Sequence, residues 1–132
     1  MPAIHHQILI NRSPAFVWDA VRDVGALHSR LVPGFVSMTE MLPDVPTPTR
    51  RVTFANGAVA DEVIVDNDDE RRRLVWSIQS VEHHNGVMTV LDAEGGALVS
   101  WTADVLPAEL AERFSPMMAA GLATMKAHLE QG

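Results

Sequence analysis

The 132-residue sequence contains neither cysteine nor tyrosine. The lack of cysteine excludes disulfide bonds, a thiolate nucleophile and cysteine-ligated metal. Without tyrosine, a hydrogen-bonding side chain in an enclosed site must come from Glu, His, Arg, Trp, Ser or Thr. No apolar run approaches the length of about 18 residues that a membrane span needs. The first residues, Met-Pro-Ala-Ile-His-His, resemble no signal peptide, and we therefore expect a cytoplasmic protein.

Basic residues are also few, and the formal net charge is −7. Because nucleic-acid binding needs a basic surface, this charge argues against a nucleic-acid partner. One basic cluster, Arg71 to Arg73, directly follows the acidic run from Asp66 to Glu70. We interpret the two runs as a solvated hairpin with compensating charges, since a phosphate site would be expected to carry a glycine-rich loop.

The six histidines lie at positions 5, 6, 28, 83, 84 and 128. Neighbouring residues of a strand point to opposite faces, so neither adjacent pair can bind one metal ion through both rings. The sequence has no H-x-H or H-E-x-x-H spacing, no Ser-His-Asp order, and no phosphate or dinucleotide loop. We expect no metal ion and no cofactor.

The final stretch, Leu106 to Gln131, has the periodicity of one long amphipathic helix that opens at Pro107. Pro116 lies inside it and predicts a break or a kink. Gly121 lies in the apolar stripe, where it indicates either close packing against a strand or room for a bound molecule. The stripe must be covered by another element, because such a helix is not stable alone in water.

Alternation of apolar and polar residues predicts that the covering element is a sheet. A first strand, 4–10, is followed by two short helices, 15–23 and 26–31. Ser13 and Pro14 are typical of a helix start. The sequence 82–86 is predicted to be a loop. We predict one domain, 1–132, in which strands two to seven form an antiparallel meander, with strands at 35–41, 50–54, 58–66, 71–80, 87–92 and 97–106.

Several segments resemble one family. Asn11 to Trp18 (Asn-Arg-Ser-Pro-Ala-Phe-Val-Trp) is similar to the start of the first helix in the polyketide cyclase/START-like superfamily, which is also called SRPBCC or Bet v 1-like. The stretches from Asp61 to Asp68 and from Leu74 to Ile78 resemble its middle strands. Gly121 to Lys126 resembles its last helix. The order of these matches spans nearly the whole chain. The resemblance implies an α+β helix-grip fold, a curved seven-stranded antiparallel sheet around a long C-terminal helix.

The resemblance also implies a cavity between sheet and helix that holds hydrophobic or amphipathic molecules such as lipids or polyketides. It does not imply one activity, because members include enzymes, carriers and receptors. Alternation places Trp76 and Ile78 on the strand face toward the helix. Simple core packing and an aromatic cavity wall are both compatible with this placement. We predict that the ligand-binding residues are Trp76, Ile78, Met88, Trp101, Phe114, Met117, Met118, Gly121 and Met125, with His83 and His84 at the cavity rim.

Glu62 is the candidate catalytic residue. Its strand carries acids and apolar residues on both faces, so alternation leaves its direction open. The resemblance favours an inward side chain, and a carboxylate inside an apolar cavity can act as a general acid or base. Arg50 and Arg51 are expected to face solvent, although one of them could reach an anionic ligand group.

Three functions compete. The first is binding of a hydrophobic small molecule by a monomer or a homodimer. The second is a cyclase or dehydratase that uses Glu62 as acid/base, with a histidine or an arginine as its partner. The third is a protein with a filled core that acts through partners or as a dimer. The sequence leaves the identity of any ligand open.

Overall fold

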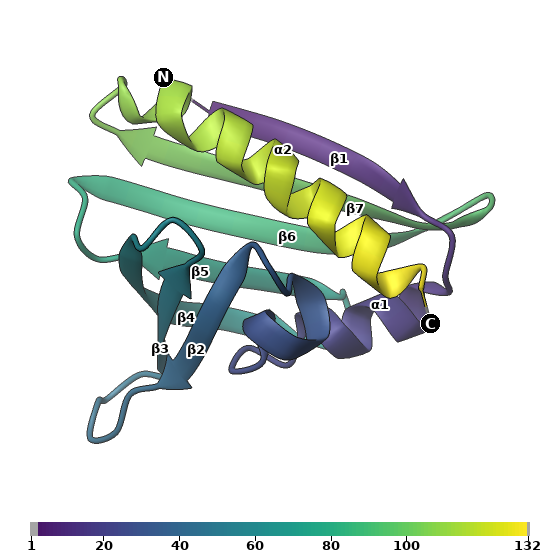
Figure 1. Cartoon of the computed structure of the whole chain (residues 1–132), viewed down its shortest axis with the longest axis horizontal. Coiled ribbons are helices and arrows are strands. Elements are labelled where there is room, and N and C mark those ends of the chain that lie inside the picture. Colours follow the sequence, from purple (N-terminus) through teal and green to yellow (C-terminus); the bar gives the residue numbers. More distant parts are fainter. Residues whose placement is uncertain (1–2, 132) are drawn as a thin grey trace.

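The computed structural model describes residues 3–131, which form a curved sheet with a long helix across its concave face (Figure 1). The helices and strands, in chain order, are β1 (Ala3–Ile10), α1 (Pro14–Val21), the π-helical turn η1 (Leu27–Leu31), β2 (Val36–Met41), β3 (Thr49–Phe54), β4 (Val59–Asp68), β5 (Arg73–Ile78), β6 (His83–Ala93), β7 (Gly96–Leu106) and α2 (Leu110–Leu129).

All strand pairs of the seven-stranded sheet are antiparallel, in the order β1-β7-β6-β5-β4-β3-β2. Strands β2 to β7 form the predicted meander, and β1 joins its far edge beside β7. The predicted helix-grip fold is therefore confirmed. No helix of residues 3–131 is long and apolar enough to cross a membrane.

Helix α1 begins as its sequence predicts. Ser13 is the N-cap, its Oγ accepts a hydrogen bond from the backbone N–H of Phe16 (3.1 Å), and Pro14 is the first helical residue. Trp18 is buried, and its indole Nε1 donates to Asp69 at the β4–β5 turn (2.9 Å). Trp18 thus anchors α1 to the sheet.

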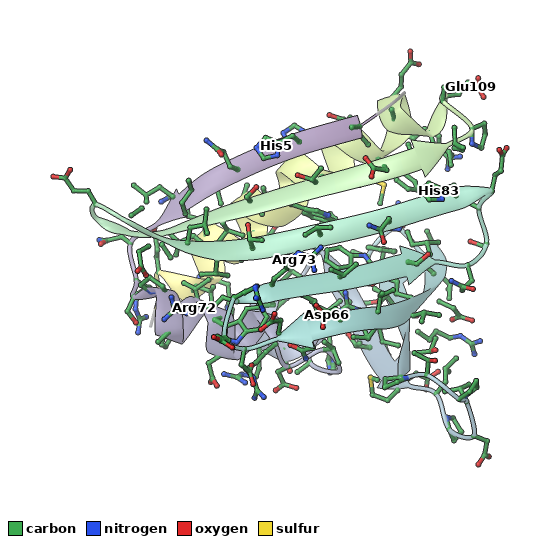
Figure 2. The ribbon with its side chains drawn as sticks, turned by 180° about the vertical axis from the view of Figure 1, so that it is seen from behind. His5, Asp66, Arg72, Arg73, His83 and Glu109 are labelled. Atoms are coloured by element: carbon green, nitrogen blue, oxygen red, sulfur yellow. The ribbon has the colours of Figure 1, made fainter. Side chains whose placement is uncertain are left out.

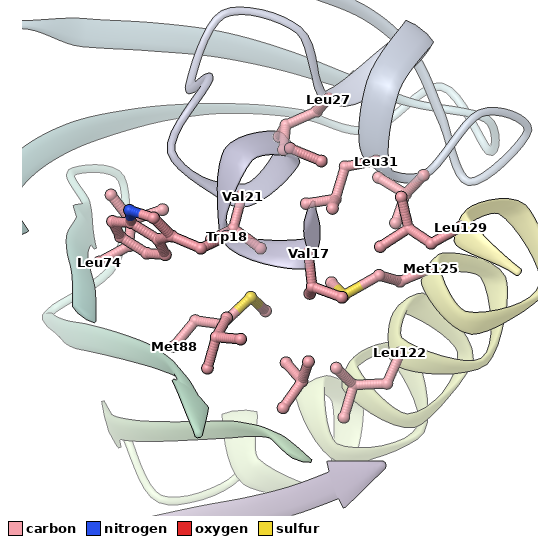
Figure 3. Packing of buried hydrophobic residues seen from close by; sticks show 14 of the residues in the cluster. Val17, Trp18, Val21, Leu27, Leu31, Leu74, Met88, Leu122, Met125 and Leu129 are labelled. Carbon is pink, nitrogen blue, oxygen red and sulfur yellow. The ribbon is translucent and has the colours of Figure 1, made fainter. Parts of the chain in front are cut away.

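One half of the space between sheet and helix is a packed core (Figure 3). Side chains from α1, η1 and the C-terminal half of α2 meet those of β5 and β6 there. Figure 3 shows Leu122, Met125 and Leu129 of α2 on one side and Leu74 and Met88 of the sheet on the other. This core holds the C-terminal half of α2 in place. The N-terminal half packs on a second, smaller cluster formed by Ile4, Ala103, Val105 and Met118.

The predicted start of α2 at Pro107 is wrong, and so is a break at Pro116. The helix begins at Leu110 with Glu109 as N-cap, because the chain continues as strand β7 through Leu106 and turns at Pro107. Pro116 does not break the helix, which is continuous to Leu129. Pro116 lies on the exposed side, where the carbonyl that loses its N–H partner, that of Glu112, can bind water instead.

The predicted loop 82–86 is wrong in most of its length, since β6 already begins at His83. A run of His-His-Asn-Gly looks like a turn, but these residues pair with β7, beginning with His83 opposite Leu106. Gly86 allows the ring of Trp76 to lie close to the backbone of β6. A Cβ at this position would lie 2.9 Å from Cε2 of Trp76.

The acidic and basic runs form the charge-compensated hairpin that was predicted. Figure 2 shows Asp66, Arg72 and Arg73 on the outer side of the sheet. Arg71 bonds Asp68 (3.0 Å) in the turn, and the other two arginines form ion pairs at 3.2 Å (Arg72 with Asp92) and 3.4 Å (Arg73 with Asp66).

Candidate functional site

A cavity of about 300 Å³ lies between the inner face of the sheet, η1 and α2. Its wall is mostly apolar. All nine residues predicted to bind a ligand line it, namely Trp76, Ile78, Met88, Trp101, Phe114, Met117, Met118, Gly121 and Met125. Their place in the wall is a finding, whereas their contact with a ligand stays a prediction.

The cavity is open to solvent on one side. The exposed members of its lining gather in three segments, the β3–β4 turn with Asn56 and Ala58, the β5–β6 loop with Ser80, and the first turns of α2 with Arg113. These segments therefore form the mouth, at the end of the molecule opposite the packed core around α1.

Two aromatic rings form much of the inner wall. Trp76 of β5 and Trp101 of β7 lie with ring centroids 5.7 Å apart and planes tilted by 52°. Gly121 of α2 faces the same region. A Cβ at Gly121 would lie 3.2 Å from Cζ3 of Trp101 and 3.3 Å from Cε2 of Phe35. These distances support the close-packing interpretation of Gly121. The glycine also lines the cavity, and room for a bound molecule at this position stays a prediction.

Glu62 points inward and is buried, with 7% of its side chain exposed. It shares this face of β4 with the buried residues Ala60 and Ile64. Its Oε1 accepts a hydrogen bond from Nε of Arg50 on the neighbouring strand β3 (2.8 Å). The candidate carboxylate is therefore one half of a buried ion pair in the cavity wall.

The expectation that Arg50 faces solvent is wrong, because only 3% of its side chain is exposed. Its Nη1 donates to the carbonyl of Val24 (3.3 Å), and its guanidinium lies 5.4 Å from the ring centroid of Trp76. That distance is within the range of a cation–π contact. Strand alternation could have found Arg50, since it shares a face with Val52 and Phe54. Arg51, its neighbour, does face outward and pairs with Asp61 (2.8 Å).

His84 and His83 do not share the predicted position at the cavity rim. His84 is buried in the cavity wall, whereas His83 is exposed on the outer face of β6 and is not part of the lining (Figure 2). The ring of His84 lies edge-on to Phe114 of α2 (centroids 6.0 Å apart). Strand alternation explains the difference, because adjacent residues of β6 point to opposite faces.

The protonation of His84 follows from its surroundings. Burial, with a smaller contribution from the charge of His83, lowers its pKa from 6.5 to about 4, and Asp104 opposes this shift. Its Nδ1 accepts a hydrogen bond from the backbone N–H of Ile78 (3.1 Å). The neutral ring therefore carries its proton on Nε2, which makes Nε2 a donor.

These polar groups lie in one row across the sheet. Arg50 is directly opposite Glu62, Glu62 is directly opposite Ile78, and the N–H of Ile78 bonds the ring of His84. Opposite residues of neighbouring strands point to the same face. The row thus carries a guanidinium, a carboxylate and a neutral imidazole on an otherwise apolar wall.

A curved antiparallel sheet gripping a C-terminal helix over an internal cavity defines the helix-grip, Bet v 1-like class of proteins. The sequence matches the family model described as "Polyketide cyclase / dehydrase and lipid transport" over residues 1–130. The chain belongs to this family, and the predicted resemblance is confirmed. No curated protein sequence matches the chain at a significant level.

Solved structures show the same fold at low sequence identity. The protein XoxI from Bacillus cereus is 19% identical, with a TM-score of 0.84 over 99% of this chain and 98% of that one. Norcoclaurine synthase from Thalictrum flavum is 20% identical, with a TM-score of 0.70 over 98% of this chain and 84% of that one. Ara h 8.0201 is 15% identical, with a TM-score of 0.75 over 99% of both chains. These likenesses support the fold and carry no substrate to this chain.

Proposed function

We propose that the protein binds a compact hydrophobic or amphipathic small molecule in the cavity between the sheet and α2. The observation that carries this proposal is the mostly apolar cavity of about 300 Å³ with one row of polar groups. Ligand sites are typically apolar with a few placed polar side chains, and this volume is at the small end of their range. Membership of a family described by cyclase, dehydrase and lipid-transport activities supports the same proposal.

The volume favours a small ligand. At about 30 Å³ for each water molecule, the cavity corresponds to roughly ten water volumes. That is room for one or two fused rings with a polar substituent. A long-chain lipid would have to leave much of its chain outside the mouth, so a compact aromatic or alicyclic molecule fits better.

Titration calorimetry with naphthalene tests the proposal. We expect saturable binding to the native protein and loss of binding in Ala60→Phe, because Ala60 is a buried residue of the cavity wall on β4 and a phenyl ring there would fill the space. The matched control is Val65→Phe on the same strand, where Val65 is 58% exposed and lies outside the lining. Equal binding by the two variants, or no binding by the native protein, would refute the proposal.

A second candidate is an aldol cyclisation or a dehydration, and the buried position of Glu62 favours it. Both reactions are redox-neutral. Aldol closure removes an α-proton, forms the C–C bond and protonates the carbonyl oxygen, and dehydration removes an α-proton and releases the hydroxyl group as water, so the protein need only transfer protons, which a carboxylate held in an enclosed site can do. Ring closure of a linear poly-β-keto thioester, followed by its absorbance, is the test. Enzyme action predicts turnover that Glu62→Gln abolishes while Asp61→Asn preserves it. Turnover that Glu62→Gln leaves intact would exclude this role.

A further inference from the structure

The polar row of the cavity has a defined charge and a defined set of unused hydrogen-bonding positions. Arg50 and Glu62 compensate each other, and His84 is neutral near pH 7, so the row carries no net charge. Within residues 3–131, Oε2 of Glu62 and Nη2 of Arg50 have no hydrogen-bond partner, and neither is sealed off from open space. The same holds for Nε2 of His84. The row thus offers one acceptor beside two donors.

The size of the row matches a small rigid molecule. Glu62 and His84 are on β4 and β6, with β5 between them, and neighbouring strands are roughly 4.8 Å apart. The two polar positions are therefore separated by roughly 10 Å at the backbone, and Ile78 provides an apolar surface between them. A fused-ring ligand can lie on this surface with its polar group at the Arg50–Glu62 end.

The charge of the row restricts the chemistry of that polar group. A free carboxylate at the pair would lie beside the carboxylate of Glu62, and like charges in an enclosed site repel strongly. A cationic group would meet the guanidinium of Arg50 in the same way. An uncharged group with both a donor and an acceptor can satisfy Oε2 of Glu62 and Nη2 of Arg50 together, so that no polar atom is left unpaired.

We propose that Arg50, Glu62 and His84 make the cavity selective for compact, uncharged ligands whose polar group both donates and accepts hydrogen bonds, such as a carboxamide, a lactam or a phenol, and that the Arg50–Glu62 pair rejects free carboxylates. This selectivity rests on the proposed function, because it assigns a ligand class to the same cavity.

Three probes of one shape test the selectivity: naphthalene, naphthalene-2-carboxamide and naphthalene-2-carboxylate, titrated calorimetrically at pH 7 into the native protein. We expect the carboxamide to bind most tightly, with the carboxylate weaker by about tenfold or more. A carboxylate that binds the native protein as tightly as the carboxamide would overturn the proposal and leave the proposed function intact. Failure of all three probes to bind would overturn both.

Charge removal at the pair provides the sharper test. Glu62→Gln leaves the buried guanidinium of Arg50 without its anion, so we expect the preference to invert and the carboxylate to become the tightest probe. Asp61→Asn is the matched control, because the Arg51–Asp61 pair joins the same two strands at the same 2.8 Å on the outer face. We expect the control to keep the native order of affinities. Inversion in the control, or the native order in a folded Glu62→Gln, would overturn the proposal.

If Glu62→Gln does not fold, a double variant tests whether the Arg50–Glu62 pair recognises the polar group of the ligand. Replacement of a buried ion pair by apolar side chains of similar volume is often neutral for stability. In Arg50→Met/Glu62→Leu the cavity keeps its shape and loses both charges. We expect naphthalene to bind this variant and the carboxamide to lose its advantage over naphthalene. A carboxamide that keeps its advantage would show that its polar group is recognised elsewhere, and the proposal would fail.

Discussion

The buried imidazole of His84 makes the stability of the protein depend on pH in a defined window. Its pKa is about 4 in the folded protein, against 6.5 for an unperturbed histidine. Between these values the unfolded chain binds a proton at this position and the folded chain does not. Stability therefore falls as the pH falls through this window, and it is fully regained above pH 6.5. The difference between the two pKa values corresponds to roughly 3 kcal/mol of unfolding free energy.

Urea denaturation followed by tryptophan fluorescence, at several pH values from 7 to 4, measures this loss. His84→Asn is the informative variant, because an amide oxygen can accept the N–H of Ile78 but does not titrate. We expect the native protein to lose roughly 3 kcal/mol relative to this variant on going from pH 7 to pH 4. His83→Asn, at the exposed neighbouring position, should keep most of the native pH dependence.

Several carboxyl groups have lowered pKa values because of hydrogen bonds to arginines or to the backbone, among them Asp61, Asp68 and Asp69. Their contribution to stability is lost below about pH 4, as they become protonated, and it is the same in the native protein and in His84→Asn. It therefore cancels in the comparison. A native-minus-variant difference that stays constant from pH 7 to pH 4 would refute the assignment of a buried, neutral His84.

Two further predictions concern stability and are measured by the same denaturation at pH 7. Arg50→Met leaves Glu62 buried without a partner and should lower the unfolding free energy by roughly 3–5 kcal/mol. Arg51→Met, at the exposed pair with Asp61, should lower it by about 1 kcal/mol or less. Similar losses in both variants would contradict the claim that burial makes the Arg50–Glu62 pair more important for stability. Gly121→Ala should change the unfolding free energy by less than about 1 kcal/mol, because the gain in helix propensity offsets the tight contact of the new Cβ with Trp101 and Phe35. Gly121→Phe should cost roughly 1–3 kcal/mol by overpacking. A large loss in the alanine variant would show that these two rings cannot move to make room.

Much of the fold could be predicted because local signals and periodicity agree in this chain. Ser13 and Pro14 start α1 as expected, and seven strands follow from alternation and turn residues. The predicted loop at 82–86 was wrong because residues typical of turns lie inside strand β6 there. Gly86 looked like part of a loop, but it allows Trp76 to approach β6 closely, and a periodicity argument cannot detect a contact between strands.

The apolar residues of the cavity wall could be predicted from the sequence, whereas only some of its polar residues could. Apolar alternation places Trp76 and Trp101 in the wall. Arg50 was missed because arginine is expected at the surface unless a partner is known. Its partner, Glu62, is distant in sequence, and only the β3–β4 register brings the two together. Once one member of the pair is assigned inward, the other becomes predictable.

The two halves of α2 differ in how firmly they are held. The C-terminal half is fixed by Leu122, Met125 and Leu129 in the core, whereas the first turns lie over the cavity mouth. These turns have no side-chain cap at Glu109, and Pro116 removes one of their hydrogen bonds. Opening of this end breaks the smaller apolar cluster with β1 and β7 and the His6–Ser115 hydrogen bond (2.8 Å) but leaves the main core intact, so we expect amide hydrogens here to exchange by local opening and not by global unfolding. For the proposed ligand, escape by the same motion would make its residence time independent of the stability of the whole fold.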